Sequence, residues 1–345
     1  MAVINYEPLG STDTTTTKTL LHESIPLTGT IVSGTYGTLL SGDNIKNYTH
    51  GMFQSVYDYP YLSSSANHIF DMTAGFNASS PLSGTGVTLE SKKMNMYNQF
   101  SQVLLGYTSS ANTIRDFELD LTLDQVGTMK EAFFINFSRL IYKDEIKKGT
   151  FSMVLGNAAW ATPFATTKTL TDASASSTAG TTNTQGGDYG ILYSGADNVA
   201  RGVIFYQAGI AVLSTSSFSP GPTFNSGAGY GYTVAQSFVT ASITGSCDAL
   251  RHRIKNISFN NTTEINSTIY FCRVPHNKYN YSANPTYLSS SQIIVKNIAS
   301  DTPVSYITTI GLYNPNNELL ATAKLSEPLR KDPSNEITLR VRLDY

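Results

Sequence analysis

The stretch Ile337-Thr-Leu-Arg-Val-Arg-Leu-Asp-Tyr345 alternates between apolar and polar residues at every position. Its apolar members are Ile337, Leu339, Val341, Leu343 and Tyr345, and its polar members are Thr338, Arg340, Arg342 and Asp344. A period of two is that of a β-strand with one buried face and one face in water. The stretch therefore predicts a strand of a sheet that covers a core on one side.

The residues before this stretch carry the same signal in several short runs. They read STIYFCRV (267–274), QIIVKNIA (292–299), SYITTIGLY (305–313) and LLATAKL (319–325). Asn314-Pro-Asn-Asn-Glu318 separates two of them and has the composition of a turn. Strands at hairpin-like spacing favour an antiparallel sheet over about residues 267–345, and a mainly β fold of the antiparallel β-sandwich kind.

Further from the C-terminus, the chain alternates between helical and strand patterns. Apolar residues recur at helical spacing over 91–105, and Gly106 follows where a C-terminal glycine is expected. A serine run opens a second predicted helix, a short one over 63–72. RGVIFYQAGIAVL (201–213) predicts two buried strands with Gly209 near their turn. We therefore expect one or two short α-helices beside the strands.

Low-complexity segments suggest how the chain is organised. Residues 1–54 are rich in Thr and Gly without a steady period, and predict an extended N-terminal arm that lies against another chain or against the body, or is a free tail. Residues 55–345 would form a β-rich body, with long loops at 156–190 and 214–232.

Composition excludes several classes of function. Only 14% of the residues are charged and the formal net charge is −2. Binding to a nucleic-acid backbone needs concentrated positive charge, so no direct nucleic-acid contact is expected. No apolar stretch approaches the length of a membrane span.

Catalytic patterns are absent from the sequence. It has no phosphate-binding loop, dinucleotide fingerprint, nucleophile elbow or metal-binding motif. The acidic residues of RDFELDLTLDQ (115–125) alternate with apolar ones, as on the solvent-exposed face of a strand. This interpretation is favoured over a pair of catalytic carboxylates such as glycosidases use. Cys247 and Cys272 either form a disulfide or are buried thiols, and the second interpretation is favoured. We expect no enzyme, no cofactor and no metal site.

Two parts of the chain resemble bacteriophage proteins. Tyr306–Leu325, YITTIGLYNPNNELLATAKL, resembles a strand–turn–strand unit in virion proteins of marine contractile-tailed phages, and loosely an element of tail-fibre attachment domains. YPYLSSSANHIFDMTAGF (59–76), KMNMYNQFSQVLLGY (93–107) and FINFSRLIYKDEIKKGTFSM (134–153) are similar to segments of structural proteins of T-even-like cyanophages. The resemblance implies a virion structural protein, without assigning any functional residue.

These observations favour a subunit of a phage tail, at the baseplate or at the fibre attachment region, that acts by assembly. Its partners would be further copies of itself and other virion proteins, with a host surface as a further contact. A capsid or neck protein is the alternative, and a carbohydrate-binding module for the host surface is a second one. The residues expected at subunit interfaces are Tyr97, Phe100, Leu104, Trp160 and Tyr313.

Overall fold

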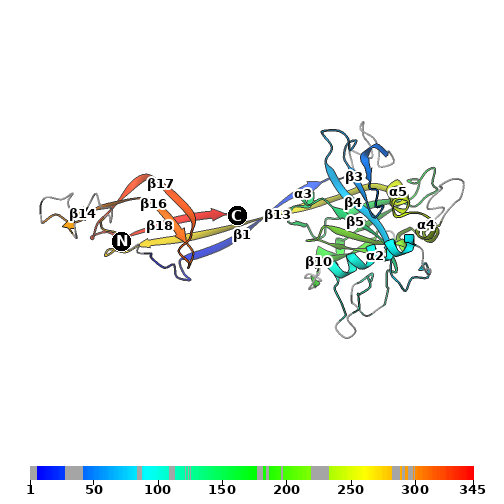
Figure 1. Cartoon of the computed structure of the whole chain (residues 1–345), viewed down its shortest axis with the longest axis horizontal. Coiled ribbons are helices and arrows are strands. Elements are labelled where there is room, and N and C mark those ends of the chain that lie inside the picture. The colour runs from blue at the N-terminus through cyan, green and yellow to red at the C-terminus, as the bar shows by residue number, and fades with distance from the viewer. Residues whose placement is uncertain are drawn as a thin grey trace. The chain divides into compact units, whose positions relative to one another are not determined.

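The computed structural model describes two compact units. The described residues are 6–27, 42–83, 88–108, 113–120, 122, 124, 126–176, 182–183, 186–195, 197–218, 233–281, 288–289, 292–293, 298 and 300–345. Residues 1–20 and 264–345 form one unit, called here the terminal unit, and residues 21–263 form the central unit. Figure 1 shows the elements of both.

One large antiparallel sheet contains most strands of the central unit (Figure 1). In the order in which they lie side by side, its strands are β1 (Thr14–Ile25), β13 (Ile254–Val274), β7 (Ser152–Gly156), β8 (Thr167–Thr171), β10 (Gly187–Ser194), β11 (Ala200–Phe205), β12 (Ile210–Ser214), β5 (Glu131–Phe137), β4 (His68–Phe76), β3 (Gln54–Tyr57) and β2 (Ile45–Asn47). The short strands β6 (Glu145–Ile146) and β9 (Thr182–Asn183) pair with β13 and β10.

The core of the central unit lies on both faces of this sheet. Along β5, Phe133 and Phe137 belong to one buried cluster and Phe134 to another, as the alternation of a strand requires. The ring of Phe137 packs 5.3 Å from that of Phe259 on β13, although five other strands separate β5 from β13 in the sheet. The sheet therefore curls until distant strands face each other, and the predicted mainly β, antiparallel fold is confirmed.

Helices cover part of this sheet. They are α2 (Thr88–Leu104), α3 (Arg139–Tyr142), α4 (Val234–Thr240) and α5 (Ile243–Arg253), with the 3-10 turns η1 (Gly42–Asn44), η2 (Ala173–Ser176) and η3 (Thr215–Phe218). The predicted helix over 91–105 is confirmed by α2, and Gly106 follows it in the left-handed conformation (φ 75°). α2 approaches β4 so closely that a Cβ on Gly75 would lie 2.5 Å from the carbonyl oxygen of Lys93.

Two local predictions were wrong. Residues 68–76 form strand β4, although a helix was expected over 63–72, because this segment pairs with β3 and β5 and is buried on both faces along most of its length. The acidic stretch 115–125 forms no strand in its described part, where Glu118 makes a single isolated bridge to Thr128.

The segments predicted as arm and loops contribute to the sheet. The N-terminal segment 1–54 supplies β1 and β2, and its first twenty residues fold with the terminal unit. Segment 156–190 supplies β8 and the start of β10. Of segment 214–232, residues 219–232 lie outside the described residues.

The terminal unit consists of strands. The end of β13 pairs with β18 (Ile337–Asp344), and β16 (Ser305–Tyr313) pairs with β17 (Leu319–Lys331) in a hairpin. The two-residue strands β14 (Leu288–Ser289) and β15 (Gln292–Ile293) pair with each other. Residues near the N-terminus join β13, where the Phe271 N–H donates to the Asp13 carbonyl.

Candidate assembly surface

The described residues of the terminal unit bury almost no apolar core. Among its described residues, the buried apolar side chains are Val274 and Val341, exposed by 8% and 7%. Its large exposed apolar side chains are Tyr6, Leu9, Leu20, Tyr279, Tyr281, Ile298, Tyr306, Tyr313, Leu319, Leu320, Leu329 and Tyr345. Because apolar burial is the main force that opposes chain entropy, the described part of this unit gains little stability from its own packing.

Strand geometry explains where the apolar groups gather. On β18 the predicted alternation is confirmed: Leu339, Val341 and Leu343 point to one face and the residues between them are exposed. The register aligns Tyr270 with Val341 and Cys272 with Leu339, so both strands present their apolar residues on the same face. Apart from Val341, these side chains are only half-buried.

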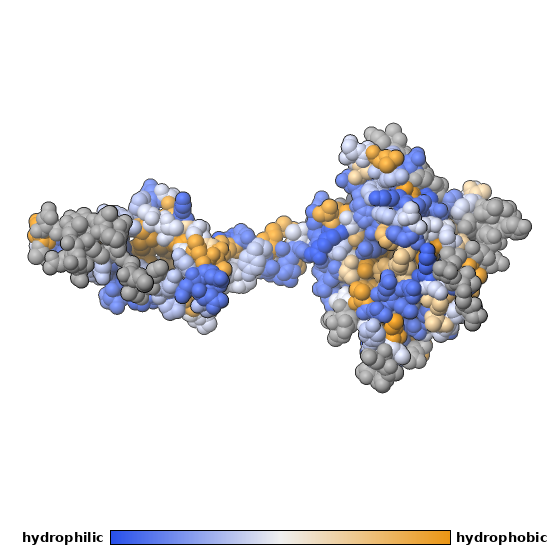
Figure 2. Space-filling view, viewed as in Figure 1, coloured by the Kyte–Doolittle hydropathy of each residue, from blue (hydrophilic) through white to orange (hydrophobic). Residues whose placement is uncertain are grey.

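A hollow lies between this face and the hairpin of β16 and β17. Its volume is about 1670 Å³. The side chains around it include Tyr6, Tyr270, Tyr279, Tyr281, Tyr306, Ile307, Ile310, Leu312, Tyr313, Leu320, Leu339 and Leu343. Figure 2 shows apolar residues at the surface of this unit. Small-molecule sites are about 300–1,000 Å³, so the hollow is too large for a small ligand to fill.

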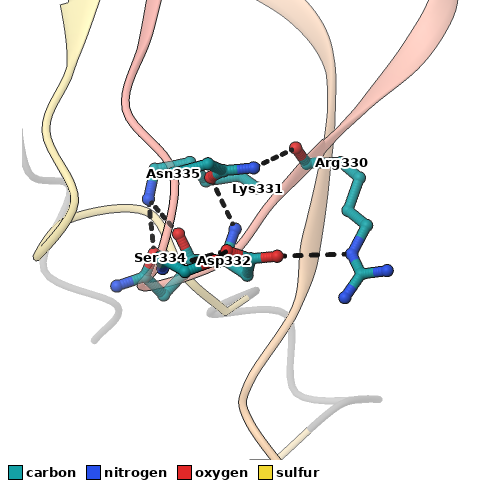
Figure 3. Close-up of polar contacts among 6 residues, drawn as sticks. Arg330, Lys331, Asp332, Ser334 and Asn335 are labelled. Carbon is teal, nitrogen blue, oxygen red and sulfur yellow. Dashed lines mark hydrogen bonds and ion pairs between the residues drawn. The ribbon is translucent and has the colours of Figure 1, made fainter.

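The loop from β17 to β18 is held by a dense set of polar contacts (Figure 3). The Asp332 carboxylate accepts from the Ser334 N–H at 2.9 Å and lies 3.4 Å from the Arg330 guanidinium. Hydrogen bonds from Ser334 hold the pKa of the Asp332 carboxyl below its ordinary value. The Asn335 side chain closes the loop by accepting from the Asp332 N–H and donating to the Arg330 carbonyl. This turn fixes β18 beside the hairpin.

Lys331 lies at the start of the same loop and is fully buried. Its ammonium donates to the side-chain oxygen of Asn280 at 2.6 Å and to the carbonyls of Asp332 at 2.8 Å and His276 at 3.3 Å. Three acceptors match the three donors of an ammonium group. The lysine therefore ties β17 to the residues that follow β13, by polar contacts in place of an apolar core.

Charges in the terminal unit are balanced and mostly paired. Over residues 1–20 and 264–345 the sequence has nine Lys and Arg and nine Asp and Glu. Ion pairs join Lys18 with Glu264, Arg273 with Asp13, Lys278 with Glu7, Arg330 with Asp332 and Arg342 with Asp344. The surface of this unit therefore has no net field to attract a strongly charged partner.

The five residues predicted at interfaces lie in both units. Tyr97 and Leu104 are buried in the central core, and the Tyr97 hydroxyl donates to the Met129 carbonyl at 2.9 Å. Phe100 is half-buried and stacks on Phe134.

Trp160 and Tyr313 have more open positions. Trp160 is half-buried and stacks on His252, with ring centroids 3.8 Å apart. Tyr313 is 44% exposed, lines the hollow of the terminal unit and meets Tyr6 edge to face at 4.9 Å. Of the five, it is Tyr313 that belongs to the hollow.

Sequence reasoning missed the other members of the hollow. Tyr306 and Leu320 are exposed by 65% and 69%, although both stand in strands whose neighbours are apolar. The available signal was the pair Leu319-Leu320. Adjacent residues in a strand point to opposite faces. One of the two leucines is therefore exposed unless both faces of the strand are buried.

The central unit holds one arrangement that resembles a nucleophile cluster. On β3 and β4, the Ser55 hydroxyl and His68 Nε2 both reach Oδ1 of Asp71, at 2.5 and 2.9 Å. In a serine nucleophile the imidazole accepts the hydroxyl proton and the carboxylate orients the imidazole. Here the hydroxyl proton points to the carboxylate, so this geometry does not activate Ser55.

The described residues contain no group of three or more His, Cys, Asp or Glu side chains that could hold a metal ion. Cys247 and Cys272 are free thiols, the first buried and the second half-buried. In this part of the chain no helix has both the length and the apolar character needed to cross a membrane.

The hollow of the terminal unit is thus the feature that best suggests a site. Comparison of the chain with family models, with curated proteins and with solved structures gives no match.

Proposed function

We propose that the chain is a structural subunit of a bacteriophage virion that acts by assembly with other subunits, in the tail at the baseplate or fibre attachment region. The observation that carries this proposal is the terminal unit, whose described residues include two buried apolar side chains and line a hollow of about 1670 Å³. A unit of this kind gains its missing stability by covering its apolar face against another chain. The central unit, with its continuous core, has no such need.

The resemblance of segments 59–76, 93–107, 134–153 and 306–325 to phage structural proteins supports the virion as the setting. The hairpin of β16 and β17 matches the strand–turn–strand unit that carries part of this resemblance. Its turn is the expected one, because Asn314 Oδ1 accepts from the N–H groups of Asn316 and Glu318.

A capsid or neck protein remains the alternative within the same kind of particle. A shell protein would be expected to carry a long spine helix. The longest helix of the described residues is α2, with 17 residues, which corresponds to about 25 Å. The tail is therefore the favoured position.

The experiment that tests this function is the location and copy number of the chain in intact particles. Quantitative mass spectrometry gives the copy number, and antibody labelling in the electron microscope gives the position. A low multiple set by cyclic symmetry, on the tail axis, is the expected result. Many copies spread over the head would show a capsid protein and would reject the tail position. Absence of the chain from the particle would overturn the proposal as a whole.

The tyrosines of the hollow favour one second candidate, a carbohydrate-binding module. Tyr6, Tyr279, Tyr281, Tyr306 and Tyr313 offer aromatic faces, and such rings can stack on saccharides. Isothermal titration of the monomeric chain with neutral oligosaccharides tests this candidate, and binding that is lost in Tyr306→Ala would support it.

A further inference from the structure

Under the proposed assembly function, a partner covers the exposed apolar face of the terminal unit. The charge, hollow and free strand edge of this unit restrict what kind of molecule that partner is. We propose that the partner is the terminal unit of a second copy of this chain, so that the two units complete each other's core. This inference rests on the proposed assembly function and names the partner of the same surface.

The first argument is the balance of charge. Nine cationic and nine anionic side chains give the terminal unit no net charge, and five ion pairs already join ten of these eighteen groups. An acidic or basic partner would find no opposite field here. Two copies of a neutral unit do not repel each other, so electrostatics favours self-association over a charged partner.

The second argument is the size and polarity of the hollow. Its apolar lining comes from four strands and from residues outside them such as Tyr6 and Tyr279, and most of these side chains are half-buried or exposed. A packed interior leaves few voids larger than a water molecule, so this space calls for several large apolar side chains. The exposed set of the same unit, which includes Leu319, Leu320 and Leu329, supplies such side chains from a second copy.

The third argument is the free edge of β18. Asn266 and Tyr345 exchange both of their backbone hydrogen bonds, each at 2.8 Å. Pairs that exchange both bonds alternate with pairs that exchange none, so Thr338, Arg340 and Arg342 direct their N–H and C=O groups away from β13. Within the described residues, no strand pairs with that outer edge.

An open edge of this kind favours a polypeptide over a saccharide as partner. β18 has eight residues, no proline and no break in its alternation, and its charged residues Arg340, Arg342 and Asp344 all lie on the face turned away from the hollow. Another strand satisfies its outward N–H and C=O groups in register. Two copies related by a twofold axis present the same edge to each other in antiparallel orientation, which closes the assembly.

The test compares two variants of the full chain. Leu320→Glu changes a side chain that lines the hollow and is 69% exposed in the single chain. Leu62→Glu makes the same change at an 85% exposed leucine of the central unit. Because neither leucine is packed in the single chain, both variants should fold. Far-UV circular dichroism checks that they do.

Sedimentation velocity over a wide range of concentration gives the association constant of each protein. Leu320→Glu should weaken self-association about 30-fold or more, as expected for a residue at the centre of an interface. Leu62→Glu should leave it unchanged. Tyr306→Glu, on the opposite strand of the hairpin and 65% exposed, should reproduce the effect of Leu320→Glu.

A second measurement does not depend on any substitution in the interface. The chain has two cysteines; Cys247 is fully buried, and Cys272 lines the hollow. The rate at which a maleimide labels the native protein therefore reports on Cys272. This rate should fall as the wild-type concentration rises, and should stay high for Leu320→Glu.

Three outcomes would overturn the inference. In the first, the wild-type chain stays monomeric at every concentration. In the second, Leu320→Glu associates as strongly as the wild type. In the third, a neutral oligosaccharide slows maleimide labelling of Cys272 in the monomer. If the chain is nevertheless found on the tail of the particle, the proposed function stands and only its partner is wrong. Self-association through the terminal unit in a chain that is absent from particles would reject the virion role alone.

Discussion

Replacing Tyr206 by Phe should lower the free energy of unfolding of the central unit by about 2 kcal/mol. The Tyr206 hydroxyl is buried and donates to Asp172 Oδ2 at 2.8 Å. The same carboxylate accepts from the backbone N–H groups of Gly149 at 2.8 Å and Phe151 at 2.9 Å. It thereby joins the end of β8, the entry to β7 and the turn after β11.

The expected magnitude follows from this geometry. Phenylalanine fits the space of the tyrosine ring, so no cavity contributes to the change. What is lost is one hydrogen bond to a carboxylate, worth about 1.5–3 kcal/mol when both groups are buried. Burial, and then the charge of Asp172, raise the pKa of Tyr206, so the hydroxyl stays a donor at neutral and alkaline pH. Gly190 leaves room for it, since a Cβ there would lie 1.9 Å from the hydroxyl oxygen.

Urea unfolding followed by tryptophan fluorescence measures the change. The chain has one tryptophan, Trp160, and it packs against the core of the central unit, so the signal follows that unit alone. Tyr107→Phe, at a tyrosine that is 49% exposed, is the matched control and should change the stability by less than about 0.5 kcal/mol.

A double-mutant cycle decides whether the hydrogen bond is the cause. Asp172→Ala should cost about 4 kcal/mol, because it leaves two buried donors and the half-buried N–H of Gly149 without their acceptor. In that background, Tyr206→Phe should cost well under 1 kcal/mol. A loss of 2 kcal/mol that persists without Asp172, or no loss in the wild-type background, would refute the reasoning.

Two further predictions concern the same unit. Burial lowers the pKa of His252 below its ordinary 6.5. Between the lowered value and 6.5, His252 is protonated mainly in the unfolded chain. The free energy of unfolding therefore rises with pH through this window. The fluorescence of Trp160, which stacks on this imidazole, should titrate with a midpoint below pH 6.5, and His252→Gln should abolish the transition. Gly209→Ala should cost about 3 kcal/mol in urea unfolding, because φ is +65° and the new Cβ would lie 2.3 Å from the Tyr142 ring. Gly51→Ala, with φ +62° and open space around it, should cost only about 1 kcal/mol, and equal losses at both sites would contradict the steric argument.

Local periodicity predicted the elements in which each face keeps the same environment, core or solvent, along its length. Residues 337–345 alternate because one face of β18 meets the hollow and the other meets water. The strands within 201–213 were predicted because their buried runs flank Gly209, the position that needs a positive φ. Helix α2 was predicted because Tyr97 and Leu104 face the core at helical spacing.

The wrong and missing predictions depend on contacts distant in the sequence. Strand β4 is buried on both faces along most of its length, so the alternation that marks a strand is obscured, and the serines before it resemble a helix start. Nothing local indicates that residues 1–20 fold with 264–345. Their association depends on pairs such as the Asp13 carbonyl with the Phe271 N–H, which are more than two hundred residues apart.

The candidate site could be predicted only in part for the same reason. Tyr313 was identified from the hairpin that contains it, whereas the position of Tyr306 and Leu320 depends on a face that the described residues leave exposed. A sequence pattern tells which residues share a face of a strand. It does not tell whether the chain itself covers that face, because this depends on how many layers the fold supplies.

The terminal unit suggests a structural reason for the low charge content of the chain. Exposed apolar patches on a free protein promote indiscriminate association, which a high net charge would suppress. The terminal unit combines such a patch with no net charge, so under the proposed assembly its solubility would depend on a specific partner that covers the patch. Folding of this unit would then be coupled to association, and its stability would vary with the concentration of the partner. The central unit buries a core of its own, so its stability would be independent of that concentration. The proposed assembly thus assigns the two units of one chain different conditions for stability.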